Sequence, residues 1–387
     1  MPFVHMAIEG NGDLLPCCMG TPLDSANISG HTLNDMLTHP ARTEMQTAFK
    51  ENKQFENCAI CWKDNSAFSP RVKFSTSSYS MDFTRSVMMG AVPENKMTWL
   101  EIKPGNRCNL KCRICGVHNS SGWAKDAYEM SGSSVPYKQS HIYDHMKKCE
   151  WIDQDQVWAD VSGLEHVNTI HMMGGEPFMI SEHYEFLQRF ADAYDISKVT
   201  LWYNTNGTWT IPEKYSELFD SVGVVKLSVS IDDIAHRYDY QRPGVAWESV
   251  TQTVSQLFTL SEKKNYHVSL DPTVSIYNVL YLSEFIEFCN TAGWSFNYSP
   301  NHFVDNESYN NIRTLSSDQK EKIVATLSAS KHVNHPLIQN TLRFITSDFW
   351  SQKMQDERVA RIKQLDTIRN ENFADVFPEL NQILEIY

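Results

Sequence analysis

The chain has 387 residues and a formal net charge of −13, from 34 basic and 47 acidic side chains. Hydrophobic residues make up 41% and aromatic residues 12%, which excludes a disordered chain and predicts a folded globular protein. Because the sequence has no apolar run of roughly 18 residues, no signal-peptide pattern at its start and no basic stripe, we expect a cytoplasmic protein that binds neither membranes nor nucleic acid.

Residues 1–92 form the first region, which we expect to be a small accessory domain. It contains a turn at Gly10 to Asp13, a helical pattern around Thr32 to Lys53, and a serine-rich connector from Ser66 to Ser80. This loop-rich composition differs from the strand-rich pattern that follows it.

Residues 93–304 form the second region, in which short β-type runs alternate with helical patterns. The apolar face of one predicted helix holds Val250, Val254 and Leu257. This alternation at the spacing of βα units predicts an α/β fold with a mostly parallel sheet, either an open barrel or a doubly wound sheet. The six runs are WLEIK at 99, NTIHMM at 168, VTLWY at 199, VKLSVSI at 225, HVSLDPTV at 267 and WSFNY at 294.

Residues 305–387 form the third region, which is charged and helical in pattern from about Leu315. A helix breaker at Phe377-Pro378 interrupts the pattern. We expect a helical segment appended to the sheet.

The nine cysteines cluster, because seven of them lie in the first 115 residues. An odd number of cysteines without an export signal is a poor disulfide framework, whereas closely spaced thiols in a reducing compartment often bind metal. Cys289 lies on the apolar face of a predicted helix and is interpreted as a core thiol. Cys149 lies on a polar connector and is given no role.

Three cysteines, Cys108, Cys112 and Cys115, follow the first β run with the spacing C-x3-C-x2-C. Three thiolates on one short loop can each bind one iron of a cubane cluster and leave the fourth iron open. A structural zinc site usually has four closed ligands in paired C-x2-C spacing, which fits this loop poorly.

A second motif, Gly174-Gly175-Glu176-Pro177, follows the next β run. Paired glycines at the carboxyl end of a strand allow close approach of a ligand to the backbone, and Glu176 supplies a carboxylate for an ammonium group. Both motifs lie at the carboxyl ends of successive strands, which is the ligand-binding edge of such folds.

Together these motifs resemble the radical S-adenosylmethionine (radical SAM) enzymes, whose three-cysteine loop follows the first strand and whose GGEP motif follows the second. The resemblance implies a partial (βα)6 TIM-like barrel with a [4Fe-4S] cluster on Cys108, Cys112 and Cys115, and S-adenosylmethionine on the open iron. An electron donor such as flavodoxin or ferredoxin would reduce the cluster, and cofactor cleavage would give a 5′-deoxyadenosyl radical that abstracts hydrogen from the substrate. The position before the third cysteine is often aromatic in the family and is Ile114 here.

The same resemblance assigns cofactor contacts to the GGEP motif and to the next turn. Glu176 would bind the methionine amine, with the backbone around Gly174 and Gly175. The turn at Asn204-Thr205-Asn206-Gly207 is similar to the TNG turn of the family, so that either Asn204 or Asn206 would reach the cofactor. The alternative is an Asn-Gly turn without a ligand.

The fourth predicted strand contributes two further assignments. By resemblance, Ser230 would contact the cofactor ribose, and Arg242 would pair with the cofactor carboxylate, an arrangement that the planar guanidinium favours. The alternative for Arg242 is a solvated turn residue.

The other cysteine set resembles the auxiliary-cluster module called SPASM or twitch, placed before the barrel as in a subgroup of twitch proteins. A G-x4-C element ends at Cys17, which Cys18 follows, and a C-x2-C pair lies at Cys58 and Cys61. The upstream cysteine usual in the module would fall at or before Pro2 and is absent. Either Cys18 completes a second cluster or one iron stays open, and four such thiols would also suit zinc.

Two candidate bases lie late in the predicted strands, Asp271 in the fifth and Tyr298 in the sixth. An aspartate before Pro272 also fits a strand-end turn. The sequence thus predicts a radical SAM enzyme that modifies a peptide or protein side chain by crosslinking, dehydrogenation or epimerisation. The alternatives are a small-molecule dehydrogenase, acting for example on a sugar alcohol, and a non-catalytic iron–sulfur or zinc scaffold.

Overall fold

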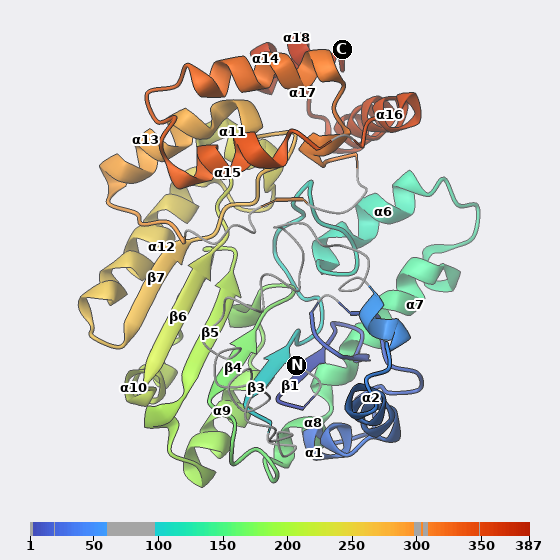
Figure 1. The fold of residues 1–387 in the computed structure, drawn as a ribbon, viewed down its shortest axis with the longest axis vertical. Coiled ribbons are helices and arrows are strands. Elements are labelled where there is room, and N and C mark those ends of the chain that lie inside the picture. The colour runs from blue at the N-terminus through green and yellow to red at the C-terminus, as the bar shows by residue number, and fades with distance from the viewer. Residues whose placement is uncertain (1–2, 19, 60–96, 298–302, 305–308, 348) are drawn as a thin grey trace. The chain divides into compact units, whose positions relative to one another are not determined.

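The computed structural model describes residues 3–18, 20–59, 97–297, 303–304, 309–347 and 349–387 (Figure 1). It divides into two compact units, each of which is considered by itself. The first unit comprises Met1–Arg107, His145–Asn204 and Ile211–Lys226. The second comprises Cys108–Asp144, Thr205–Thr210 and Leu227–Tyr387.

The described strands are arranged in the order β2-β1-β3-β4-β5-β6-β7. The neighbouring pairs β1 with β3, β3 with β4, and β4 with β5 are parallel, which confirms a mostly parallel α/β sheet. The strand bounds are β1 His5–Ile8, β2 Leu14–Leu15, β3 Trp99–Ile102, β4 Thr169–Met172, β5 Thr200–Thr205, β6 Val224–Val229 and β7 Tyr266–Leu270.

Five of the six predicted β runs are confirmed as β3 to β7. In the described part of the sixth run, residues 294–297, the structure has a parallel bridge between Leu270 and Phe296 and no strand. Since isolated bridges lack the repeated hydrogen bonds of a ladder, alternating apolar residues in this run were not sufficient for a strand.

Two strands of the first region were not predicted. β1 pairs in parallel with β3, from His5 opposite Trp99 to Ile8 opposite Ile102, and β2 pairs with β1 in the antiparallel sense. All four residues of β1 are buried, so it has no polar alternation by which to recognise it. Part of the predicted accessory region therefore belongs to the main sheet.

The helical pattern around Thr32 to Lys53 forms two helices rather than one. Thr32 caps the first helix in a capping box with Asp35, and Pro40 occupies the first turn of the second, where its missing N–H costs no hydrogen bond. The helices within the first unit are α1 Leu33–Leu37, α2 Pro40–Lys50, α8 Asp155–Ala159, α9 Glu182–Ala193 and α10 Ser216–Ser221. Helix α7, His141–Lys148, contains a boundary between the units.

One face of the first unit's strands packs against α9. The Tyr203 ring of β5 stacks on Phe178 with ring centroids 4.7 Å apart, and its hydroxyl lies 2.7 Å from Nε2 of His183 in α9. Because side chains alternate along a strand, Glu101, His171 and Trp202 lie on the face opposite Tyr203, which is called the inner face below.

The predicted helical third region is confirmed in the second unit, and Phe377-Pro378 separates α17 from α18 as expected. Cys289 is fully buried on α13, which confirms it as a core thiol, and Cys149, which was given no role, is buried as well. No helix within the described ranges has the length and apolar character to cross a membrane. The helices of this unit are α6 Ala124–Met130, α11 Ala235–Gln241, α12 Trp247–Thr259, α13 Leu282–Ala292, α14 Ser317–Ser328, α15 Pro336–Phe344, α16 Gln352–Arg369, α17 Phe373–Val376 and α18 Pro378–Leu384.

Candidate functional site

The three-cysteine loop lies after the carboxyl end of β3, as the sequence predicts. Cys112 is buried, and Cys108 and Cys115 are partly exposed. A tight turn joins the last two, because the N–H of Cys115 donates to the carbonyl of Cys112 at 2.9 Å. The loop thus presents one shielded thiol and two accessible ones.

Hydrogen-bond donors lie near two of the three sulfur atoms of this loop, those of Cys108 and Cys112. The Sγ of Cys108 lies 3.4 Å from the backbone nitrogen of Leu110 and 3.7 Å from Nδ2 of Asn206. The Sγ of Cys112 lies 3.7 Å from Nη1 of Arg242. Donors of this kind stabilise a thiolate, which is the form that binds iron.

Burial raises the pKa of the Cys112 thiol to about 12, against the opposing effect of the Arg242 guanidinium. The thiol therefore keeps its proton at neutral pH until a metal ion displaces it. Among the described residues, no three His, Cys, Asp or Glu side chains already converge as a metal-binding group. The donors aimed at the sulfur atoms and the soft thiol ligands nevertheless fit an iron–sulfur cluster chemically.

The GGEP motif follows β4 and forms a tight turn. The backbone of Gly175 has a φ of +48°, and a Cβ there would lie 2.3 Å from the carbonyl oxygen of Arg107, so only glycine fits. Glu176 is fully buried, and its Oε1 accepts a hydrogen bond from the N–H of Phe178 at 3.2 Å. Pro177 starts the short 3₁₀ turn that Glu176 caps.

The two candidate asparagines have different surroundings. Asn204 ends the inner face of β5, with its Oδ1 2.6 Å from Nε2 of His171. Asn206 lies beside the cysteine loop, where its Nδ2 donates to Oδ1 of Asn109 at 3.0 Å and approaches Cys108. Of the two, Asn206 is the residue placed next to a predicted cluster ligand.

Ser230 and Arg242 both come after strand β6 in the sequence. The N–H of Ser230 donates to the carbonyl of Thr205 at 2.8 Å, which fixes its position at the strand end. Arg242 is buried and its Nε donates to Oδ2 of Asp232 at 2.7 Å. Burial lowers the pKa of Arg242, but Asp232 and Cys112 outweigh it and the net shift is upward, so the guanidinium stays charged.

Asp232 and its neighbour Asp233 were not among the predicted site residues. Asp232 also accepts a hydrogen bond from the N–H of Thr273, two residues after the candidate base Asp271. The N–H of Asp271 itself donates to the carbonyl of Val229 at the end of β6. Burial raises the pKa of Asp233 to about 7, although Arg237 opposes the shift. A pKa near neutrality suits acid–base chemistry. The other candidate base, Tyr298, lies outside the described residues.

A second unpredicted group lies on the inner face of the first unit. The carboxylate of Glu101 on β3 lies 3.4 Å from Nε2 of His5 on β1 and 3.8 Å from Nδ1 of His171 on β4. The His171 ring stacks on Trp202 with centroids 4.1 Å apart. A glutamate inside an apolar strand was the sequence signal for this group, because buried glutamates are almost always paired.

The auxiliary cysteines lie in two adjacent segments of the first unit. Cys17 is buried, Cys18 is partly exposed, and Cys58 ends a 3₁₀ turn. The N–H of Thr21 donates to the carbonyl of Asn57 at 3.0 Å, and this bond holds the two segments together. Cys61 lies outside the described residues.

Two family descriptions match this chain. The Radical SAM superfamily matches residues 102–268, and SPASM, an iron–sulfur cluster-binding domain, matches residues 1–62. The first match includes the three-cysteine loop and the GGEP motif, and the second includes all four predicted auxiliary cysteines. No curated relative matches the chain.

Similar solved structures have low sequence identity to this chain. Native anSMEcpe with bound AdoMet is 15% identical with a TM-score of 0.37, covering 69% of this chain and 66% of its own. SuiB of Streptococcus suis bound to the precursor peptide SuiA is 11% identical with a TM-score of 0.33, covering 98% of this chain and 74% of its own. The chain thus spans slightly less than two thirds of anSMEcpe, and likeness at this level does not identify a substrate.

Proposed function

From the premise that this chain belongs to the radical SAM superfamily and carries a SPASM-type domain, we propose that it modifies a peptide or protein side chain oxidatively. The family brings a [4Fe-4S] cluster and S-adenosylmethionine, and the SPASM-type domain brings an auxiliary iron–sulfur cluster. When bound, these groups supply a 5′-deoxyadenosyl radical that removes a hydrogen atom from the substrate.

The chain's own residues would hold and shield this chemistry. Cys108, Cys112 and Cys115 would bind the cluster, with Asn206 and Arg242 donating to its sulfur ligands. Hydrogen bonds to cluster sulfurs tune the potential at which a cluster accepts an electron.

By the same resemblance, cofactor binding would use residues that follow β4 and β6 in the sequence. Glu176 is the proposed partner of the methionine amine, and Ser230 that of the ribose. Because Arg242 already contacts Asp232 and Cys112, a cofactor carboxylate would share the positive charge of its guanidinium with them.

The substrate proposal is carried by the presence of both family domains on one chain, joined through one sheet. Strand β1 from the SPASM-matched segment pairs in register with β3, which leads into the three-cysteine loop. Auxiliary-cluster members of the family often act on peptides, and the net charge of −13 favours a basic one. We assign the auxiliary cluster to residues 1–92 and the radical chemistry to 93–304, with 305–387 as supporting structure.

We further propose a cytoplasmic setting and a low-potential donor such as flavodoxin or ferredoxin. A reducing compartment keeps thiols available as iron ligands.

The test is an anaerobic reaction of the reduced protein with S-adenosylmethionine and a short peptide encoded beside its gene. We expect loss of two hydrogens for a crosslink or dehydrogenation, or solvent deuterium incorporation for an epimerisation, each read by mass spectrometry. Replacing Cys58 and Cys61 with Ala should abolish this product and spare cofactor cleavage. Turnover of a sugar alcohol, with no change in any peptide, would contradict the peptide proposal and favour the small-molecule dehydrogenase.

A further inference from the structure

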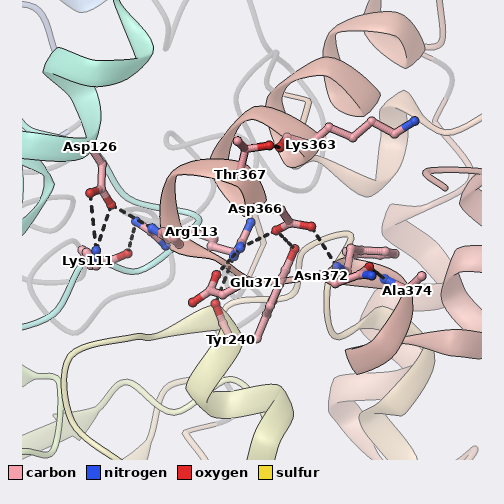
Figure 2. Close-up of polar contacts among 12 residues, drawn as sticks. Lys111, Arg113, Asp126, Tyr240, Lys363, Asp366, Thr367, Glu371, Asn372 and Ala374 are labelled. Atoms are coloured by element: carbon pink, nitrogen blue, oxygen red, sulfur yellow. Dashed lines mark hydrogen bonds and ion pairs between the residues drawn. The ribbon is translucent and has the colours of Figure 1, made fainter.

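The junction of α16 and α17 in the second unit sends charged side chains to the three-cysteine loop (Figure 2). Asp366 and Arg369 lie at the end of α16, and Glu371 lies just beyond it. All three contact residues 111–126, which include two of the cluster cysteines. The sequence analysis gave this junction no functional role.

Arg369 fixes the backbone of the loop before its second cysteine. Its Nη2 donates to the carbonyl of Lys111 at 2.8 Å, and its Nε donates to Asp126 at 2.8 Å. Its guanidinium lies over the Trp123 ring, 4.7 Å from the centroid, and Trp123 in turn donates to the carbonyl of Cys112 at 2.8 Å. Two consecutive carbonyls of the loop are thus held in place.

Arg113 lies between the second and third cysteines, and its side chain is 0% exposed. Its Nη2 donates to Oδ1 of Asp366 at 2.6 Å and also to Glu371, while its Nε donates to the carbonyl of Tyr240 at 3.1 Å. The guanidinium lies 3.5 Å from the centroid of the Tyr240 ring. A buried arginine with this many partners holds the loop in one position.

Asp366 has hydrogen-bond donors other than Arg113. Its carboxylate accepts from the Tyr240 hydroxyl at 2.7 Å, from the N–H of Phe373 at 2.8 Å and from the Tyr387 hydroxyl at 3.0 Å. These three hydrogen bonds do not involve Arg113, so the Asp366 carboxylate keeps three hydrogen-bond donors if the arginine is removed.

We propose that Arg113, Asp366 and Glu371 are positioning residues that fix the cysteine loop and set the reduction potential of the cluster bound there. A cluster gains negative charge when it is reduced, so a nearby positive charge favours reduction and a nearby negative charge opposes it. Arg113 lies between two of the ligands in the sequence, and because its side chain is buried, water and salt screen its charge weakly. The inference depends on the cluster that the three-cysteine loop is proposed to bind, and not on the identity of the substrate.

The test is the midpoint potential of the cluster in the full chain, measured without substrate by a redox titration followed by electron paramagnetic resonance. Glu371→Gln removes a negative charge and should shift the potential in the positive direction. Arg113→Met removes a positive charge while Asp366 keeps three donors, and should shift it in the negative direction. Arg113→Lys restores the charge and should bring the potential back toward that of the wild type.

Shifts of opposite sign in the midpoint potentials of Glu371→Gln and Arg113→Met distinguish the proposal from a general loss of structure, which would shift both potentials in the same direction. The matched control is Arg358→Met, because Arg358 is a buried arginine like Arg113, but it lies on α16 and its hydrogen bonds run to Tyr309, Thr314 and Gln355. It should lower the melting temperature without shifting the potential. If Arg113→Met does not retain a cluster, the midpoint potential of Glu371→Gln still tests the proposal. The Glu371 side chain is 23% exposed, so the fold should tolerate this substitution. Absence of a positive shift in Glu371→Gln, or shifts of the same sign in both variants, would overturn the proposal.

Discussion

The carboxylate of Glu101 is 3% exposed and lies within 4 Å of two histidine rings that come from the strands on either side of β3. Burial raises the pKa of Glu101, but the hydrogen bonds and charges of His171 and His5 outweigh it and leave the pKa well below its usual value. The residue is therefore ionised at neutral pH, and it ties β1 and β4 to β3 through side chains as well as through the backbone.

Glu101→Gln should lower the free energy of unfolding by about 2 to 3 kcal/mol, because it removes a buried carboxylate that lies against two buried histidine rings. Denaturant unfolding of anaerobically prepared protein would measure the change. Glu284→Gln is the control, since that side chain is 62% exposed and its ion pair should contribute less than about 1 kcal/mol. Equal stability of Glu101→Gln and the wild type would show that the charge of this carboxylate does not stabilise the fold.

Gly175→Ala should destabilise the turn after β4 by about 2 kcal/mol or more and weaken S-adenosylmethionine binding, because the new Cβ would overlap the Arg107 carbonyl. Calorimetric titration with the cofactor and the melting temperature would measure both effects. Gly116→Ala, one residue after Cys115, is the control because a Cβ there meets nothing within 4 Å. Unchanged cofactor affinity in Gly175→Ala would contradict this assignment of the turn.

At this scale the sequence indicated which positions are constrained better than it indicated the atoms that constrain them. The paired glycines were expected to let a ligand approach the backbone, and in the structure the atom nearest to a Cβ at Gly175 is the carbonyl oxygen of Arg107 in the same chain. Arg242 was expected to pair with the cofactor carboxylate, which stays a prediction, and in the structure its guanidinium pairs with Asp232. Contacts of this kind form only in the folded chain, so spacing along the sequence does not reveal them.

Helix α9 is fixed to the sheet by a polar contact inside an apolar layer. His183 is fully buried, with Nε2 2.7 Å from the Tyr203 hydroxyl and Nδ1 2.5 Å from the carbonyl of Ile180. Burial lowers the pKa of His183 to about 3, so the ring is neutral throughout the neutral range.

This neutral histidine predicts acid-sensitive stability. Below the pKa of about 6.5 that histidine has in an unfolded chain, the unfolded state binds a proton that the folded state does not, so stability is lost as the pH falls from about 6.5 toward 3. The loss should reach at most about 5 kcal/mol, because each pKa unit of difference between the two states corresponds to about 1.4 kcal/mol. His183→Gln removes the titration, and its melting temperature should fall less steeply than that of the wild type between pH 6.5 and 4.5. Parallel melting curves of the two proteins over this interval would contradict the prediction.

Elements with a clear period were predictable, and short buried ones were not. The runs at 99, 168, 199, 225 and 267 all became strands because apolar runs bounded by turns recur at βα spacing. β1 has only four residues, all of them buried, and its place beside β3 depends on pairing with residues more than ninety positions away.

On the scale of the whole molecule, the proposal requires two iron–sulfur clusters in one chain. Protein reconstituted without air should therefore contain about eight iron atoms per chain, four for each cubane. Cys58→Ala should lower this to about four and leave cleavage of S-adenosylmethionine intact. About four iron atoms in the wild type, or loss of cleavage in folded Cys58→Ala, would contradict the division of the cysteines into two sets.

The long-range organisation of the molecule was the part least accessible from the sequence. The charged third region was expected only as an appended helical segment, yet its Asp366 binds Arg113 across 253 positions of the chain. Charge patterning shows that a helix is polar, but it does not show which buried arginine elsewhere needs a counter-charge.

The central claim is that the loop of Cys108, Cys112 and Cys115 supports radical cleavage of S-adenosylmethionine. The most direct measurement is 5′-deoxyadenosine formed by the reduced, reconstituted protein with S-adenosylmethionine, quantified by chromatography and mass spectrometry. We predict 5′-deoxyadenosine and methionine from the wild type and none from the variant with all three cysteines replaced by Ala. A wild-type protein that shows a reducible cluster by electron paramagnetic resonance and still forms no 5′-deoxyadenosine would contradict the claim.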